Sequence, residues 1–599
     1  MEEKEVKKRK ISLRKIAWKV LKFIWEYNRA YLIWEFLLVI FMSVLPIIVA
    51  WYSAVFINKI QVGGFSSIFD KELILIVSLY IGLPLLVNLA RVWQAHLFSK
   101  FFIFFGQYMD LKVVEKKAEL DIQTYEKSDF NNLVLRVNEN LGKIAWFSDY
   151  ILFAFGRLID ILASSIILIS YSPWIAIVLL TSLLPDLYVE IKYGKQKWSI
   201  WDAKTEIRRK YFEARRHFNH LPSLIEQKIF KTKDFLKSIM QFFLSAFDDD
   251  FLKTEEIRTK SKFFSTTIVY IANAIVIFYL MDDVVGKTLL IGTFIFILGR
   301  TTDLKNDLTE FFRGLARLNA DANFMEDIFI FLNTKKEMKN GVDELTTGAS
   351  EIEFKNVSFS YPDSDKMILK NLNFKIKKGE KIAIVGVNGA GKTTLTKLIL
   401  RFYDGTKGEI LIGNNNIKNL ELNSYYSKVG YLSQEYARYR MKIKDVIAIG
   451  NTNIPFNMEN VIASAKKSGA HEFIMSYKNG YDTYLGREFE GGEEPSMGQW
   501  QKIALARIFY KNPEIWILDE PTASIDAVAE MEIFENLENL PDDKTVILIS
   551  HRFNTVKNAD RIMIIEEGEA KELGSHADLM KIKNGIYKNL FNTQKESFK

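Results

Sequence analysis

The stretch Gly386-Val-Asn-Gly-Ala-Gly-Lys-Thr393 matches the phosphate-binding pattern G-x-x-x-x-G-K-[ST]. It follows Lys381–Val385, a short apolar run typical of a buried parallel strand, and it leads into Thr393–Leu400, which has helical periodicity. At a strand-to-helix junction, a glycine-rich loop presents backbone N–H groups to phosphate oxygens. The sequence therefore predicts an α/β nucleotide-binding domain around this loop.

The residues of the loop have different expected roles in nucleotide binding. Gly386, Gly389 and Gly391 allow the backbone to turn tightly and to approach phosphate closely. Lys392 is expected to reach the β- and γ-phosphates, and Thr393 to ligate Mg²⁺. The pattern indicates a nucleoside triphosphate bound with Mg²⁺.

Two more apolar strands are expected to end in residues suited to hydrolysis. Ile515–Leu518 runs into Asp519 and Glu520. Carboxylates at the end of a buried strand are costly unless they meet a cation or polarise water, so Asp519 suits the Mg²⁺ shell and Glu520 the attacking water. A run over 545–550 is followed by His551, one of six histidines in the chain and a candidate γ-phosphate sensor.

In this order of motifs, residues 351–599 resemble the ATPase domain of an ATP-binding cassette (ABC) transporter. Tyr361 matches the aromatic residue that stacks on adenine, Gln434 the Q-loop glutamine, Ala523–Asp526 the D-loop and His551 the switch histidine. The resemblance implies catalytic roles for Glu520, His551 and Gln434, and Mg²⁺ ligation by Thr393, Gln434 and Asp519. It implies nucleotide contacts by Tyr361, Gly386, Asn388, Gly389, Gly391, Lys392, Thr393, Thr394, Ser496, Gly498, Gln499 and Asp526.

The signature motif departs from the family pattern. The family has Leu-Ser-Gly-Gly-Gln, whereas this chain has Pro495-Ser-Met-Gly-Gln499. In the family, this segment opens a helix and reaches across a dimer to the γ-phosphate bound by the other chain. Pro495 is compatible with a helix start, which has no use for that N–H, whereas Met497 adds bulk where glycine permits close approach.

The altered signature leaves two assemblies open. In a homodimer, the departure is a tolerated variant. In a heterodimer, Lys392, Glu520 and His551 would build the competent site with a partner's intact signature, and the altered signature would face the partner's weakened site.

The composition is that of a membrane half joined to a soluble half. The chain has 599 residues, of which 48% are hydrophobic and 26% charged, and it has no cysteine. The formal net charge of +7 is too small for this length to indicate nucleic-acid binding. Without cysteine, disulfides, thiol chemistry and cysteine-ligated metals are excluded.

Six membrane-spanning helices are expected before the ATPase domain, each near the length that a bilayer requires. The expected spans are 31–57, 73–93, 150–171, 174–192, 265–285 and 289–308. An amphipathic stretch over 11–27 is expected to lie in the membrane interface, and the basic N-terminus favours a cytoplasmic start. Two long polar segments, 94–149 and 194–264, are then cytoplasmic excursions. This layout resembles the ABC exporter membrane domain, whose excursions end in coupling helices; the matching stretches are 125–130 and 221–231.

Ionisable residues inside the expected spans are either structural or line a pathway, because a charge at bilayer depth is expensive. These residues are Glu35, Arg91, Arg157, Asp160, Asp186 and Glu190. Arg157 and Asp160, three apart on one helix, are expected to pair. Asp186, directly after Pro185, is the preferred candidate for lining a pathway.

The sequence as a whole predicts an all-α, six-helix transmembrane domain followed by an α/β P-loop ATPase domain with the family's β and α subdomains. The expected parts are 1–30 (N-terminus and interfacial helix), 31–332 (transmembrane domain), 333–350 (linker) and 351–599 (ATPase domain). The expected function is ATP-driven export of an amphipathic small molecule, lipid or peptide across the cytoplasmic membrane by a dimer. An importer, or a membrane ATPase that transmits force or signal without flux, remains an alternative. A soluble nucleic-acid-remodelling ATPase conflicts with the expected spans.

Overall fold

The computed structural model divides the chain into two compact units. It describes residues 12–64, 67, 69–203, 205–345, 351–362, 364–521, 535–537, 540–550 and 556–597. The helical unit comprises residues 1–120 and 127–335, and the ATPase unit comprises 121–126 and 336–599. A six-residue segment from inside the helical half of the sequence is therefore part of the ATPase unit.

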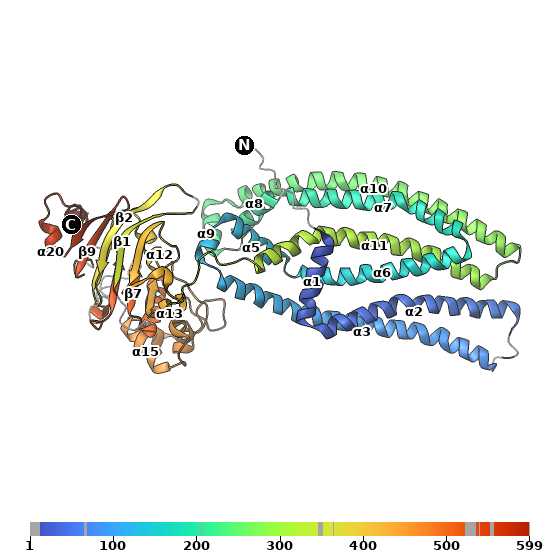
Figure 1. Cartoon of the computed structure of the whole chain (residues 1–599), viewed down its shortest axis with the longest axis horizontal. Helices are drawn as coiled ribbons and strands as arrows, with labels where there is room; N and C mark the ends of the chain where they lie inside the picture. The colour runs from blue at the N-terminus through green and yellow to red at the C-terminus, as the bar shows by residue number, and fades with distance from the viewer. Residues whose placement is uncertain are drawn as a thin grey trace. The chain divides into compact units, whose positions relative to one another are not determined.

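Long helices that run alongside one another build the helical unit (Figure 1). Its elements are α1 (Leu13–Tyr27), α2 (Arg29–Val62), α3 (Lys71–Glu119), α5 (Ser128–Asn140), α6 (Lys143–Tyr171), α7 (Pro173–Ala203), α8 (Thr205–Arg216), α9 (Leu221–Phe230), α10 (Lys233–Val285) and α11 (Ile291–Leu332). The short α1 crosses the bundle and buries Ile16, Val20 and Ile24, which recur every fourth residue and so share one face. The expected amphipathic segment is thus a helix with one buried stripe.

Five described helices are long and apolar enough to cross a membrane: α2, α3, α6, α7 up to Tyr193, and α10. The sixth expected span, 289–308, falls on α11, which is not among the five. Arg300, Asp303, Lys305 and Asp307 interrupt its apolar sequence. The helix predicted there is present, and its charged residues face other parts of the unit, as shown below.

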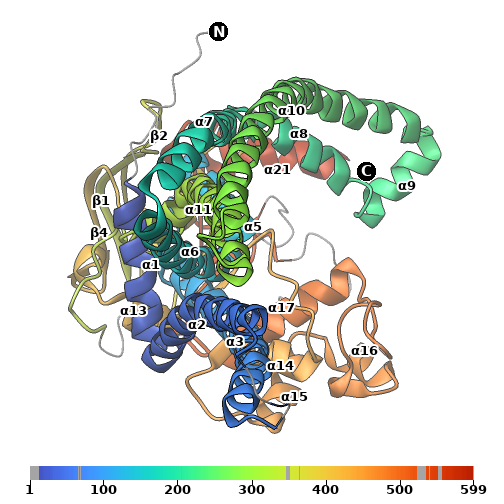
Figure 2. The same cartoon turned by 90° about the vertical axis from the view of Figure 1, so that its right-hand side faces the viewer.

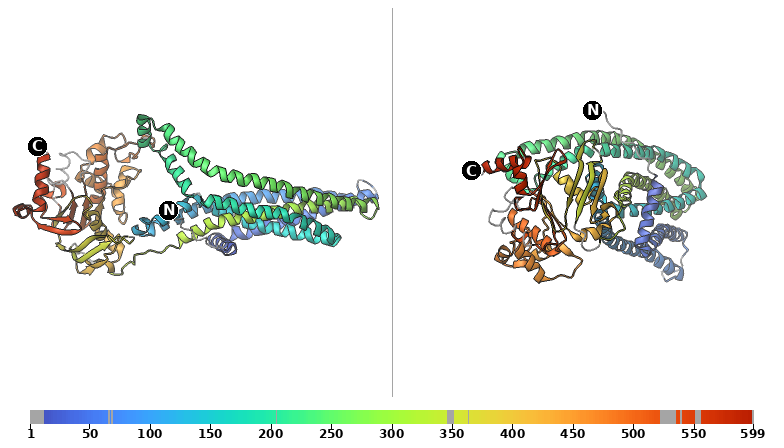
Figure 3. Two further views of the ribbon diagram at one scale, coloured as in Figure 1. Left: turned by 90° about the horizontal axis from the view of Figure 1, so that it is seen from above. Right: turned by 60° about the vertical axis from the view of Figure 1, so that its left-hand side comes forward.

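Separate helices build each of the two expected excursions. Helix α3 runs to Glu119, and α7, α8 and α10 carry the second excursion, with α9 at its tip (Figures 2 and 3). Exposed apolar side chains cover much of α9, including Leu221, Ile229 and Phe230. The tip of the first excursion, α4 (Ile122–Tyr125), belongs to the ATPase unit.

Two sheets form the frame of the ATPase unit. A four-stranded antiparallel sheet has the order β2-β1-β4-β5, and a six-stranded, mainly parallel sheet has the order β10-β9-β3-β8-β7-β6. The strands are β1 (Ile352–Ser360), β2 (Met367–Ile376), β3 (Lys381–Val385), β4 (Lys407–Ile412), β5 (Asn415–Asn416), β6 (Val429–Leu432), β7 (Ile515–Asp519), β8 (Thr545–Ile549), β9 (Arg561–Glu566) and β10 (Glu569–Gly574). The three strands predicted from apolar runs are β3, β7 and β8.

Helices and short turns fill the rest of this unit. They are α12 (Lys392–Ile399), η1 (Ile417–Asn419), α13 (Leu422–Lys428), α14 (Ile443–Ala448), η2 (Ile449–Asn451), α15 (Met458–Lys467), α16 (His471–Ser476), η3 (Gly480–Asp482), α17 (Met497–Lys511), α20 (His576–Lys581) and α21 (Ile586–Ser597). Helices α14 to α17 share a core of their own around Trp500 and Ile503. The expected β and α subdomains are both present.

The expected linker, 333–350, lies partly on the ATPase unit. Asp343 donates its backbone N–H to the Asn419 carbonyl, and Leu345 is buried in the main core of the unit. Arg401 donates to the carbonyl of Lys339 at 2.8 Å. The chain thus meets the ATPase unit before the first strand begins.

Candidate functional site

The phosphate loop joins β3 to α12, as the sequence predicts. Gly389 and Gly391 have φ values of 82° and 108°, a left-handed backbone that side chains disfavour. A Cβ at Gly386 would lie 2.3 Å from the carbonyl oxygen of Ile565 on β9. Two of the glycines are therefore required by backbone conformation and the third by close packing against the sheet.

The ammonium group of Lys392 lies against the loop itself. Its Nζ donates to the carbonyls of Gly386 at 2.6 Å and Val387 at 3.1 Å. Burial lowers the pKa of Lys392, although the carboxylates of Glu520 and Asp519 oppose that shift. A desolvated ammonium group whose hydrogen bonds within the described residues go to two carbonyl oxygens is well suited to donate to phosphate oxygens.

The parallel sheet brings the other predicted residues to the same edge. Strands β6, β7, β8 and β3 are hydrogen-bonded neighbours and run parallel, so their carboxyl ends lie together. Asp519 ends β7, and Gln434 follows β6. The Gln434 amide donates to a Glu520 carboxylate oxygen at 3.3 Å. Lys392, Gln434, Asp519 and Glu520 thus form one polar cluster, although the sequence separates them widely.

The surroundings of Asp519 disfavour its charged form unless a cation is bound beside it. Its side chain is buried, and burial together with the charge of Glu520 raises its pKa to about 6, against the opposing effect of Lys392. A buried carboxylate beside a second carboxylate is stabilised by a bound metal ion. The donor set of Asp519, Gln434 and the Thr393 hydroxyl is all oxygen, which fits Mg²⁺.

Glu520 has a strained backbone that its neighbours maintain. Its φ is 50°, in the left-handed region that non-glycine residues rarely adopt. Its N–H donates to the carbonyl of Ile549 at 2.9 Å, and its own carbonyl accepts from the amide of Gln501 at 3.0 Å. The side chain of Gln501 is buried. Gln501 is a functional candidate that our sequence reasoning missed; its place in the helix that follows the signature was the available signal.

The predicted adenine aromatic, Tyr361, lies beside the loop helix. Its hydroxyl is 3.2 Å from the hydroxyl of Thr394, a buried residue of α12. The ammonium of Lys397 lies over the Tyr361 ring, 5.4 Å from its centroid. Tyr403 packs edge-on to the same ring at 5.2 Å. The face and tilt of Tyr361 are therefore set by residues of α12 and the turn that follows.

The same cluster holds the segment from the first excursion. Glu126, directly after α4, accepts a hydrogen bond from Lys397 at 2.6 Å and another from the Tyr403 hydroxyl. Burial alone would raise the pKa of Glu126, but these two donors outweigh it and lower the pKa. The expected coupling stretch thus contacts the residues that position Tyr361.

The signature segment begins α17. Ser496 is the helix cap: its hydroxyl accepts from the Gln499 N–H at 3.3 Å, and the Gln499 side chain accepts from the Ser496 N–H at 2.8 Å. This capping box fixes the start of the helix at Ser496. Pro495 lies before the helix, where its missing N–H removes no helical hydrogen bond. Met497 is half exposed and its sulfur accepts from Arg438 at 2.9 Å. The added bulk of Met497 therefore rests against Arg438.

Two predicted site residues lie outside the described residues: Asp526 in the D-loop and His551. Asn388, Thr393 and Gly498 lie where their motifs place them, on the loop, α12 and α17 respectively.

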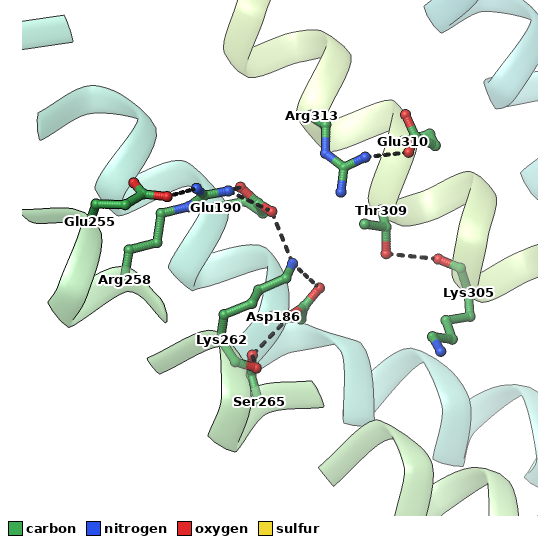
Figure 4. A network of polar contacts seen from close by, with 10 residues as sticks. All are labelled: Asp186, Glu190, Glu255, Arg258, Lys262, Ser265, Lys305, Thr309, Glu310 and Arg313. Atoms are coloured by element: carbon green, nitrogen blue, oxygen red, sulfur yellow. Dashed lines mark hydrogen bonds and ion pairs between the residues drawn. The ribbon is translucent and has the colours of Figure 1, made fainter. Parts of the chain in front are cut away.

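In the helical unit, Asp186, the preferred candidate for lining a pathway, is paired with side chains of the neighbouring helix α10. Its carboxylate is buried and accepts from Lys262 at 2.9 Å and from the Ser265 hydroxyl at 2.8 Å (Figure 4). Lys262 also donates to Glu190, which pairs with Arg258. Asp186 and Glu190 thus tie α7 to α10, because the cations needed to satisfy them come from the neighbouring helix.

The expected pair of Arg157 and Asp160 is present, with 3.2 Å between the charged atoms. Arg157 also pairs with Asp307 of α11, which links α6 to α11. These residues, together with Glu35 and Arg91, line a cavity of about 530 Å³ among α2, α3, α6 and α11, whereas Asp186 and Glu190 do not.

Comparison with known proteins agrees with this geometry. Residues 369–523 match the family model described as "ABC transporter". The chain is 27% identical to "Subtilin transport ATP-binding protein SpaT" of Bacillus subtilis, over 94% of this chain and 92% of that protein. It is 36% identical to "Putative multidrug export ATP-binding/permease protein YgaD" of Bacillus subtilis (strain 168), over 55% of this chain and 56% of that protein.

The fold has a counterpart among solved structures. "Structure of a bacterial Atm1-family ABC exporter with ATP bound" superimposes with a TM-score of 0.74, covering 94% of this chain and 98% of that one at 23% sequence identity. The helical unit and the ATPase unit together thus have the fold of an ABC exporter. The chain carries an ABC transporter ATP-binding domain and resembles the exporter type of ABC half-transporter along nearly its whole length.

Proposed function

We propose that the chain is one half of a dimeric ATP-driven exporter in the cytoplasmic membrane, with its N-terminus and ATPase unit in the cytoplasm. ATP is the energy source, and the cargo is an amphipathic molecule that crosses between the helical domains. The observation that supports this proposal most strongly concerns the segment 121–126. This segment comes from the helical half of the sequence, yet it is part of the ATPase unit. Its residue Glu126 is hydrogen-bonded to Lys397, beside Tyr361. A segment that directly follows α3 in the sequence is thus held by residues that position Tyr361.

The residues of the cluster have distinct roles in this proposal. Tyr361 stacks on adenine, and the loop N–H groups with Lys392 hold the phosphates. Mg²⁺, when bound, neutralises charge on the β- and γ-phosphate oxygens, and Thr393, Asp519 and Gln434 would hold it. Glu520 accepts the proton of the attacking water, and Gln501 keeps the Glu520 backbone in place.

The second half of each site comes from another chain. Ser496 and Gly498 of that chain meet the γ-phosphate, so ATP bridges two ATPase domains. Closure draws the excursion tips together and opens the helical domains outward; hydrolysis and product release reverse this. The exposed apolar residues of α9 support a partner surface at the second tip, because a lone chain leaves them in water.

A homodimer, in which the altered signature is a tolerated variant, is the preferred assembly. The altered signature keeps a heterodimer open, with Lys392, Glu520 and His551 serving a partner's signature. An importer is the alternative for the direction of transport. The direction of flux in inside-out vesicles distinguishes import from export.

The test uses the absence of cysteine in this sequence. Chains carrying Ser496→Cys and chains carrying Asn388→Cys, with different tags, are mixed and treated with a short bifunctional thiol reagent. We expect a mixed cross-linked dimer that forms with ATP under non-hydrolysing conditions and disappears without nucleotide. Chains with Cys at the exposed Glu472 are the control. No cross-link with trapped nucleotide, in this chain alone or with a candidate partner half, would overturn the proposal.

A further inference from the structure

The cavity in the helical unit has a charge composition that no motif predicted. Its volume is about 530 Å³, and α2, α3, α6 and α11 line it. Five carboxylates and three guanidinium groups face it: Glu35, Asp149, Asp160, Asp303 and Asp307, with Arg91, Arg157 and Arg300. The formal charge of this set is 3 − 5, or −2.

Most of these charges already neutralise one another. Arg157 pairs with Asp160 and Asp307, and Arg300 pairs with Asp303. These three carboxylates and two guanidinium groups hold α6 and α11 in place. Glu35, Asp149 and Arg91 are left with no ion-pair partner among the described residues.

Glu35 is the most unusual of the three. Its side chain is 1% exposed, and one carboxylate oxygen accepts from Gln94 at 2.6 Å. The other oxygen, Oε2, is buried without a hydrogen-bond partner in the described part of the chain. A buried carboxylate oxygen left unsatisfied is costly, and a cation or donor that enters the cavity removes that cost.

Asp149 adds a second negative charge on the wall formed by α6. No hydrogen bond or ion pair to it is found within the described ranges. Arg91 lies on an exposed part of α3, and its contact is with Asn88 at 3.4 Å. The buried part of the cavity therefore carries excess negative charge, and the guanidinium group of Arg91 lies at its exposed margin.

Apart from Ser43 and Gln94, the remaining lining is apolar. Val39, Met42 and Ile47 of α2 face Phe98 of α3 and Leu152 of α6. A ligand that satisfies the whole cavity needs a hydrophobic body and a positive group.

We propose, resting on the export function proposed above, that this cavity binds a hydrophobic organic cation whose ammonium, guanidinium or equivalent group lies beside the carboxylates of Glu35 and Asp149. The apolar body then packs on α2, Phe98 and Leu152. Cargo of the opposite charge meets the two uncompensated carboxylates and is disfavoured.

The test uses a pair of probes of the same shape and opposite charge, tetraphenylphosphonium and tetraphenylborate. The full chain is placed in nanodiscs of zwitterionic lipid without nucleotide, and binding of each radiolabelled probe is measured by equilibrium dialysis against empty nanodiscs. We expect wild type to bind tetraphenylphosphonium at least about tenfold more tightly than tetraphenylborate, relative to the empty discs. Glu35→Gln should weaken the phosphonium affinity by about tenfold, and Asp149→Asn by less, because Asp149 is only half-buried.

Asp282→Asn is the matched control, since it removes one negative charge from an exposed position on α10 outside the cavity. It should leave both affinities unchanged. Basal ATP turnover of each variant reports folding, and Asp149→Asn, at a half-buried position, keeps the test open if Glu35→Gln does not fold. Equal binding of the two probes, or phosphonium binding that Glu35→Gln and Asp149→Asn leave unchanged, would overturn the inference. Tighter tetraphenylborate binding that Arg91→Gln abolishes would overturn it in favour of an anionic cargo. Neither result depends on hydrolysis, so the export proposal is judged separately by the cross-linking.

Discussion

The buried carboxylates of the two units differ in how completely neighbouring side chains pair with them. In the ATPase unit, Asp519 and Glu520 share an edge of the sheet with Lys392 and Gln434, and burial raises the pKa of Asp519 to about 6. In the helical unit, Asp186 is equally buried but fully paired with Lys262 and Ser265. Burial of a charge is thus functional where the partners are left incomplete and structural where a neighbouring helix completes them.

The largest effect we expect is a loss of ATP turnover on substitution of Glu520, a carboxylate of the functional kind. Glu520→Gln should lower ATP turnover by about 10²–10⁴-fold, because the amide cannot accept the proton of the attacking water. ATP binding should stay near wild type, since the loop and Tyr361 hold the nucleotide. Phosphate release and equilibrium binding of labelled ATP measure the two quantities. Wild-type turnover in this variant would remove Glu520 from the chemistry.

Asp186→Asn is the counterpart in the helical unit. It keeps the shape but loses the ion pair with Lys262, so we expect a lower melting temperature with turnover per folded molecule unchanged. A loss of turnover as large as that of Glu520→Gln would break the comparison.

The sequence predicted the ATPase unit well because its motifs lie on neighbouring parallel strands. Strand ends at one sheet edge converge whatever the loops between them, so the runs before Gly386 and Asp519 located the site. Apolar periodicity also located the long helices, including α11, whose charges excluded it from the apolar spans.

The sequence could not assign the charges within the helices. Which residue meets Asp186 or Glu35 depends on how helices far apart in sequence rotate against each other. Pro185 suggested a pathway at Asp186, but α10 presents Lys262 there. Gln501 was missed for a related reason: a buried glutamine in an amphipathic helix looks like core until the Glu520 carbonyl is placed beside it.

The next effect in size tests the strained backbone at Glu520. Gln501→Leu keeps the volume and removes the donor to the Glu520 carbonyl, so the turnover number should fall by about tenfold. The KM for ATP should change little, because Gln501 lies behind the carboxylate and not on the nucleotide. Lys502→Gln on the same helix is the control. If the melting temperature falls while the turnover number holds, Gln501 is only a packing residue.

A smaller effect concerns the sign of the stability change at Asp519. Its folded pKa, about 6, lies above the ordinary value of 3.8, so the folded chain binds a proton more readily than the unfolded chain. Stability therefore falls as pH rises through this window, and the charged form is unfavourable above it. In nucleotide-free protein at neutral pH, Asp519→Asn should raise the melting temperature by about 2–4 °C, with no gain near pH 4.

This sign is opposite to that expected for Asp186→Asn at neutral pH. Scanning calorimetry of the two variants at both pH values tests the comparison directly. A fall for both would mean that Asp519 is stabilised by its surroundings and is not held ready for a cation.

The smallest effect lies at Glu126 and Lys397, where the helical half of the sequence meets the nucleotide site. The two side chains are 40% and 25% exposed, so their coupling should be only about 0.5 kcal/mol. A double-mutant cycle of Glu126→Gln and Lys397→Met, read out as ATP affinity, measures it. Because the folded pKa of Glu126 is lowered, the pair is complete at neutral pH and weakens as pH falls through that value. A coupling in ATP affinity that fades on acidification would mean that adenine stacking on Tyr361 senses the excursion. Zero coupling in ATP affinity with a normal coupling in thermal stability would mean that Glu126 anchors the segment without informing the nucleotide site.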